Sequence, residues 1–122
     1  MWMKMRTWDL GGLPYLYARR NLRHVNFRGL IFVVDSADKE RLEEARIELE
    51  RVLESQETKH APLVILGNKI DRKNAVTERE LREALQLPED TTTGRPVRLF
   101  MCSVVYRQGY MEALRWLAQR MR

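Results

Sequence analysis

The chain has little of what several protein classes require. It contains one cysteine, Cys102, so it can form no internal disulfide. Its longest uncharged apolar runs, residues 30–34 and 61–66, are far shorter than the about 20 residues of a membrane-spanning helix. The Met-rich start lacks the apolar core and cleavage site of a secretory leader. We therefore expect one globular domain over residues 1–122, in a reducing, cytosolic setting.

Long runs of one charge are also missing. The chain has 22 Lys and Arg against 17 Asp and Glu, a net charge of +5, which alone could indicate a nucleic-acid or anionic-membrane partner. No run of consecutive basic residues exceeds two, and residues 38–57 hold eight acidic side chains against four basic ones. Solvated helix faces explain this pattern, and we expect no nucleic-acid partner.

Short apolar runs alternate with amphipathic segments along the chain. Residues 2–9 alternate with period two, as an edge strand does, and residues 97–102 are a further expected strand. Residues 29–35 and 62–67 are continuous apolar runs, typical of strands buried on both faces. This alternation predicts an α/β fold, with a mostly parallel sheet of about four strands flanked by helices.

Three segments show helical patterns. Residues 38–54 have an apolar face and, opposite it, the ion pairs Glu43 with Arg46 and Glu48 with Arg51. The expected inward residues there are Leu42, Ala45, Leu49, Val52 and Leu53. Thr77 and Glu80 form a capping box that opens a second helix, with Leu81, Ala84 and Leu85 inward and its end near Pro88.

The last helix is expected to begin near Gly109. Its apolar stripe has helical spacing and consists of Tyr110, Ala113, Leu114, Leu117, Ala118 and Met121. Trp116 lies off this stripe, which predicts partial exposure.

Asn68-Lys69-Ile70-Asp71 directly follows a predicted buried strand, where open α/β sheets place ligand-binding residues. A carboxylate such as that of Asp71 suits the paired N–H donors of guanine, which adenine does not offer. Asn68 can brace a neighbouring loop and contact the base edge, while the aliphatic stem of Lys69 can lie over the purine face. An ordinary polar turn after a strand is the alternative.

Two further motifs end predicted strands. Residues 100–104 (FMCSV) offer a second loop, with a backbone N–H for the guanine carbonyl and the Ser103 hydroxyl to support Asp71. Residues 8–12 (WDLGG) place Asp9 where it can hold a metal-bound water and Gly12 where its N–H can approach a terminal phosphate.

From WDLGG onward the chain resembles the Arf-family small GTPases, and most closely their Sar branch. The resemblance is carried by residues 8–12, 29–45 (GLIFVVDSADKERLEEA), 62–72 (PLVILGNKIDR) and 100–119. It implies a Rossmann-like three-layer fold of the P-loop NTPase type, shortened at the N-terminus. The family binds GTP or GDP with Mg²⁺, hydrolyses GTP slowly and recruits vesicle coats to membranes.

The resemblance assigns roles to individual residues. Asn68, Lys69 and Asp71 correspond to the guanine-specificity loop. Ser103 and Val104 correspond to the second base loop. Asp9 and Gly12 look like the metal-water and terminal-phosphate contacts of the second switch.

The same resemblance implies a setting and partners. We expect a role in transport from the endoplasmic reticulum to the Golgi, at the cytosolic face of these membranes. Coat-complex and exchange-factor proteins are the expected partners. Membrane contact is expected to be indirect, because the chain does not contain the family's amphipathic N-terminal helix.

Two departures from the family pattern lower the expected activity. The chain contains no G-x-x-x-x-G-K-[ST] phosphate loop and no first switch, and each lost phosphate contact is worth about 1.5–3 kcal/mol. Nucleotide and Mg²⁺ binding is therefore expected to be weak if this chain is the whole protein. Leu13 follows Gly12, where Arf proteins have a water-orienting Gln and Sar proteins a His, so we name no catalytic residue and expect hydrolysis to be weak or absent.

Three questions stay open at this point. The strand that carries the phosphate loop is central in the family's sheet, so a four-stranded rearrangement, a swapped dimer or a partly molten fragment could each result. A nucleotide-free interaction module derived from a small GTPase is the alternative function. An RNA-binding domain would rest on net charge alone, since the chain has no aromatic stacking platform.

Overall fold

The computed structural model describes residues 27–56, 58–87 and 95–121. The strands of this part are β1 (Leu30–Asp35), β2 (Leu63–Asn68) and β3 (Val97–Met101). Its helices are the short 3₁₀ helix η1 (Lys39–Arg41), α2 (Leu42–Glu54), α3 (Glu78–Ala84) and α4 (Tyr110–Arg120). The predicted strand at residues 2–9 lies outside the described residues, as do Asp9, Gly12 and Leu13.

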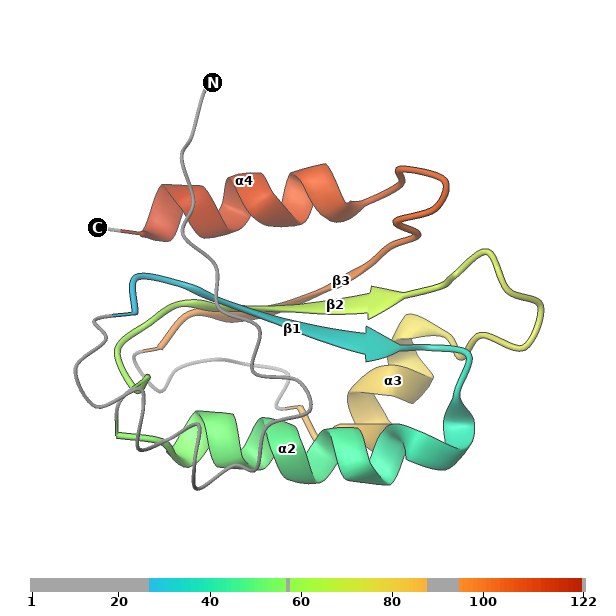
Figure 1. Cartoon of the computed structure of the whole chain (residues 1–122), viewed down its shortest axis with the longest axis horizontal. Helices are drawn as coiled ribbons and strands as arrows, with labels where there is room; N and C mark the ends of the chain where they lie inside the picture. Colours follow the sequence, from blue (N-terminus) through green and yellow to red (C-terminus); the bar gives the residue numbers. More distant parts are fainter. Residues whose placement is uncertain (1–26, 57, 88–94, 122) are drawn as a thin grey trace.

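The three described strands form one parallel sheet in the order β1-β2-β3. Helix α4 covers one face of the sheet, and α2 and α3 cover the other (Figure 1). The predicted α/β class with helices on both faces is confirmed. Because all three strands run the same way, their carboxyl ends meet at one edge, where Asp35 lies in register with Asn68.

The sheet separates two apolar cores. Leu49, Ile65 and Leu81 are buried between the sheet and α2 and α3, while Val64, Phe100 and Leu117 are buried beneath α4. Residues of β2 alternate between these two cores, so the prediction of a strand buried on both faces is confirmed for residues 62–67.

The same prediction for residues 29–35 is wrong. Ile31 and Val33 are 38% and 58% exposed, and only the alternate residues of β1 contribute to the core on the α2 side. Helix α4 packs over β2 and β3, so it leaves this face of β1 uncovered among the described residues. A continuous apolar run does not by itself distinguish a central strand from one that a helix only partly covers.

The helix boundaries largely follow their sequence signals. At the start of α3, the Thr77 hydroxyl accepts from the Glu80 N–H at 3.1 Å and the Glu80 carboxylate accepts from the Thr77 N–H at 2.9 Å, so the capping box is confirmed. The predicted ion pairs on α2 are also present, with Arg46 2.6 Å from Glu43 and Arg51 3.0 Å from Glu48. Leu53, in the last turn of α2, is 38% exposed rather than inward.

Trp116 is buried, contrary to the prediction from the α4 stripe. Its ring packs edge-to-face on Phe100 of β3, with ring centroids 6.2 Å apart, and the Arg120 guanidinium lies 4.3 Å from its centroid. An aromatic side chain reaches the sheet from the flank of a helix, so the buried face of α4 is wider than the stripe.

Arg95 fixes the opposite, amino edge of the sheet. Its buried guanidinium donates to the carbonyls of Thr58 and Lys59, which follow α2. Burial lowers the pKa of Arg95.

Within the described residues, no helix has the length and apolarity needed to cross a membrane.

Candidate functional site

The Asn68–Asp71 segment leaves β2 through a sharp turn. Lys69 has a left-handed backbone, with φ of 69°. The next N–H, that of Ile70, donates to the carbonyl of Cys102 at 3.2 Å. This backbone bond ties the loop after β2 to the segment after β3, so the two predicted base loops are neighbours.

Ser103 and Asp71 make the central side-chain contact between these loops. The Ser103 hydroxyl donates to Asp71 Oδ1 at 2.7 Å across 32 residues of sequence. The same hydroxyl oxygen accepts the Tyr106 N–H at 3.3 Å, and Ser103 itself is fully buried. Asp71 is exposed, and its second oxygen, Oδ2, has no hydrogen-bond partner in the described part of the chain.

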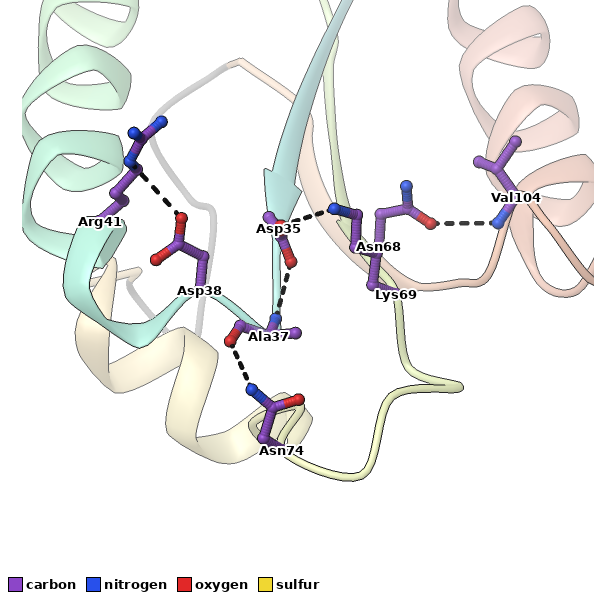
Figure 2. A network of polar contacts seen from close by, with 8 residues as sticks. All are labelled: Asp35, Ala37, Asp38, Arg41, Asn68, Lys69, Asn74 and Val104. Carbon is purple, nitrogen blue, oxygen red and sulfur yellow. Dashed lines mark hydrogen bonds and ion pairs between the residues drawn. The ribbon is translucent and has the colours of Figure 1, made fainter.

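Asn68 braces the second loop, as its position in the sequence predicted. Its Oδ1 accepts the Val104 N–H at 3.0 Å (Figure 2), and the Cys102 sulfur lies 3.9 Å from the same oxygen. With Oδ1 engaged in this way, the Nδ2 donor points elsewhere and has no acceptor within residues 27–56, 58–87 and 95–121. The sequence predicted that a backbone N–H of this loop meets the guanine carbonyl, and the Val104 N–H is already used within the protein. The Val105 N–H has no acceptor among the described residues.

The loop after β3 is held at both of its ends. Ser103 and Gln108 exchange two backbone hydrogen bonds of 3.0 and 2.9 Å. Gly109 follows with φ of 83° and caps the start of α4. These hydrogen bonds hold the two ends of the loop together, and Val104 and Val105 lie in the segment between them.

Lys69 reaches across the sheet edge to β1. Its ammonium lies 2.8 Å from Asp35 Oδ2, and the other carboxylate oxygen accepts the Ala37 N–H at 2.9 Å (Figure 2). The hydrogen bond from Lys69 is the main cause of a lowered pKa for Asp35, and it outweighs the opposing effect of desolvation. The sequence reasoning did not single out Asp35. The available signal was a polar residue ending the run 29–35, one strand away from Asn68.

Backbone contacts join the remaining loops to this edge. The Ser36 N–H donates to the Asn68 carbonyl at 3.0 Å, and the Val76 N–H donates to the Ser36 carbonyl at 2.9 Å. The Asn74 amide donates to the Ala37 carbonyl at 3.0 Å (Figure 2). The loops after β1 and β2 are thus fastened to each other beside Asp35 and Lys69.

Cys102 follows β3 and packs in the core beneath α4. It is fully buried, and burial raises the pKa of its thiol. The neutral thiol is a small packing group at neutral pH rather than a nucleophile.

The predicted phosphate and metal contacts cannot be placed. Asp9 and Gly12 lie outside the described residues. Elsewhere, in the described ranges, no three His, Cys, Asp or Glu side chains gather in a way that could hold a metal ion.

The groups left available at the edge suit a flat heteroaromatic base. Among the described residues, Asp71 Oδ2 is an acceptor without a partner, while Asn68 Nδ2 and the Val105 N–H are donors without one. The aliphatic stem of Lys69 adds an apolar surface between them. Guanine offers two N–H donors beside a carbonyl acceptor, so this donor and acceptor set fits it.

The fold defines the class of the protein as an open α/β domain with a parallel sheet, and the candidate site lies at the carboxyl edge of that sheet. Comparison with known families gives the particular assignment. A profile of the ADP-ribosylation factor (Arf) family matches residues 2–121. The chain therefore belongs to the Arf family.

Individual relatives agree with this assignment. The small COPII coat GTPase SAR1 of Giardia intestinalis is 32% identical, over 96% of this chain and 66% of that protein. ADP-ribosylation factor-like protein 1 of Caenorhabditis elegans is 34% identical, over 98% of this chain and 65% of the relative. ADP-ribosylation factor-like protein 3 of Saccharomyces cerevisiae is 28% identical, over 96% of this chain and 59% of that protein. The chain thus spans less than two thirds of the length of these relatives, and similar identities do not separate a Sar branch from Arf-like proteins.

Proposed function

We propose that the chain binds the guanine base of GTP or GDP at the carboxyl edge of its sheet. In this proposal Asp71 accepts from the two N–H donors of guanine, while Asn68 and the loop at Ser103 and Val104 contact its other edge. The Lys69 stem covers one face of the purine. Leu13 cannot orient an attacking water, so the proposed activity is nucleotide binding rather than hydrolysis.

One contact carries the proposal, the 2.7 Å hydrogen bond from Ser103 to Asp71. It fixes one oxygen of an exposed carboxylate and leaves the other free. In this contact a fully buried hydroxyl orients an exposed carboxylate, which is the arrangement that a ligand-binding acceptor needs and that an ordinary polar turn does not. Preorganised acceptors of this kind are what selective base recognition requires.

The cellular role we propose follows the Arf family and its Sar-like motifs. It is a small GTP-binding protein of vesicle-mediated transport between the endoplasmic reticulum and the Golgi. Coat-complex and exchange-factor proteins are the proposed partners. Support for the Sar branch comes from residues 100–119 and from the SAR1 relative. Mg²⁺ is proposed as the companion of the nucleotide phosphates, with Asp9 contacting it through water.

The experiment is a calorimetric titration of the 122-residue chain with GMP, GDP, XMP and AMP. We expect guanine nucleotides to bind in the micromolar range or weaker, with GMP close to GDP, because this chain carries the base contacts without a G-x-x-x-x-G-K-[ST] motif. Sub-micromolar binding of GDP would contradict this expectation. AMP binding as tight as GMP binding would refute the base site itself.

The substitution Asp71→Asn tests the assigned residue. It replaces one acceptor by a donor, so it should weaken GMP binding about tenfold and favour XMP, by analogy with other bidentate base contacts worth about 1–3 kcal/mol. Asp38→Asn is the matched control, because it removes the same charge from a carboxylate that pairs with Arg41 instead. An unchanged ratio of GMP to XMP affinity in the Asp71 variant would make Asp71 an ordinary turn residue.

A nucleotide-free interaction module is the second candidate. The observation in its favour is the apolar tip of the loop after β3, where Val104, Val105 and Tyr106 are exposed, Val105 by 79%. Such a tip can also flank a bound base, so the titration decides between the two functions. Failure of every nucleotide to bind would favour the interaction module.

A further inference from the structure

We infer that Asp35 is a positioning residue for base recognition, because its ion pair with Lys69 holds the aliphatic stem of that lysine in place for the purine to stack on. The inference rests on the proposed function and adds to it a residue on a different strand. Asp35 touches no nucleotide in this account. It acts only through Lys69.

The first support is the geometry of the pair. The backbone of Lys69 is left-handed, an unusual state for a residue with a side chain. From there its ammonium reaches a carboxylate 34 residues away in sequence, at 2.8 Å. The lysine stem consequently crosses from the end of β2 to the end of β1, beside Asn68 (Figure 2).

The second support is that Asp35 is itself restrained. One of its oxygens accepts the Ala37 N–H at 2.9 Å, and Ala37 is fastened through its carbonyl to Asn74. The carboxylate is thus oriented by the backbone before it meets the lysine, so less conformational freedom is lost when the pair forms. The lowered pKa of Asp35 agrees with a carboxylate that stays charged in this place.

The function of the pair follows from what a free lysine would do. An unpaired Lys side chain samples many rotamers and must lose them when a base stacks on its stem. Held by Asp35, the stem already lies between the ends of β2 and β1. Asp35 therefore raises guanine affinity without contacting guanine, in the manner of other preorganised sites.

The experiment is a double-mutant cycle on GMP affinity, read by calorimetry with the full 122-residue chain. Asp35→Asn and Lys69→Met each remove the ion pair, and Met keeps an unbranched apolar stem. We expect each single variant to weaken GMP binding about threefold to fivefold, as fits one partly exposed ion pair. The double variant should be no weaker than Lys69→Met alone, because Asp35 acts only through that lysine. Lys69→Ala, which removes the stem as well, should weaken binding further.

Asp38→Asn is again the matched control. The Asp38 side chain is 38% exposed against 35% for Asp35, and its own ion pair with Arg41 lies within the turn of η1. Its GMP affinity should equal that of the parent chain. Equal affinities for the Asp35 and Asp38 variants, or additive losses in the double variant, would overturn the inference.

Two outcomes separate this inference from the proposed function. If the parent chain binds GMP and Asp71→Asn shifts preference to XMP, while Asp35→Asn has no effect, the base site stands and the positioning role is refuted. If the parent chain binds no guanine nucleotide, both fall together. If thermal denaturation shows that Asp35→Asn is unfolded, Lys69→Met remains as a test, because it breaks the pair from the lysine side without touching the Ala37 turn. A GMP affinity of Lys69→Met equal to that of the parent chain would then overturn the inference.

Discussion

Replacing Gly109 by alanine should destabilise the fold at the base of the candidate site. Gly109 has φ of 83°, and a Cβ added there would collide with the carbonyl oxygen of Met101 and lie 3.2 Å from Cys102. The left-handed backbone costs an alanine about 1–2 kcal/mol, and overpacking adds about 1–3 kcal/mol. Because the colliding atom is backbone at the end of β3, it cannot move aside alone. We expect the free energy of unfolding to fall by about 3 kcal/mol.

Urea denaturation, monitored by circular dichroism, measures this loss. If the slope of the unfolding free energy against urea concentration is the same for both chains, the two-state comparison holds. Gly29→Ala is the matched control. The three atoms of the described residues nearest to its Cβ would be side-chain atoms of Leu117 and Met121, at 3.1 Å, and its φ is unexceptional. Gly109→Asn separates the two causes, because Asn tolerates the left-handed backbone but still carries a Cβ. Equal stabilities of the Gly109→Ala and Gly29→Ala chains would refute the reasoning.

Two further predictions concern charge and packing. The pKa of Asp35 is lower in the folded chain than its ordinary value of 3.8, so its stabilising effect is present above that value and is lost as the pH falls through the folded pKa. The stability difference between the parent chain and Asp35→Asn should thus be constant from about pH 5 to 7 and shrink below about pH 4; a difference that grows on acidification would contradict the lowered pKa. Trp116→Ala should lower the free energy of unfolding by about 3–5 kcal/mol in urea denaturation. A loss near that of a surface substitution, about 0.5 kcal/mol, would instead support the partial exposure that the sequence predicted.

The parts of the fold that the sequence predicted are those set by local signals. The run at residues 62–67 is continuous and apolar and is followed by a polar residue, and it forms the central strand β2 of the described sheet. Thr77 and Glu80 satisfy each other within one helical turn, so their pattern needs no information from the rest of the chain. Both depend only on residues that are close in sequence.

The errors fall where a distant element decides the outcome. Val33 is apolar like its neighbours, but its burial depends on which strands α4 covers. Trp116 lies off the helical stripe, but Phe100 on β3 provides a ring for it to pack against. Periodicity describes one element, and it does not reveal the width of the surface against which that element packs.

The candidate site also has contacts that the sequence predicted and contacts that it could not predict. Asn68, Asp71 and Ser103 were expected to meet because the carboxyl ends of parallel strands share an edge, and their hydrogen bonds agree. The engagement of the Val104 N–H by Asn68 depends on a side-chain rotamer, which the pattern does not contain. The ion pair between Lys69 and Asp35 depends on a left-handed backbone at Lys69 and on the register of two strands.

These contacts have a consequence for affinity and selectivity. The hydrogen bonds that orient Asp71, Asn68 and Lys69 all join residues between 35 and 106, within the sheet edge itself. In the proposed site, base selectivity depends on the donors and acceptors that have no partner among the described residues of this edge, whereas most of the binding energy of a nucleotide comes from charge-assisted contacts to its phosphates. The two properties are therefore separable in this chain. Its preference among bases should persist in GMP, at an affinity that one base edge and one lysine stem can supply.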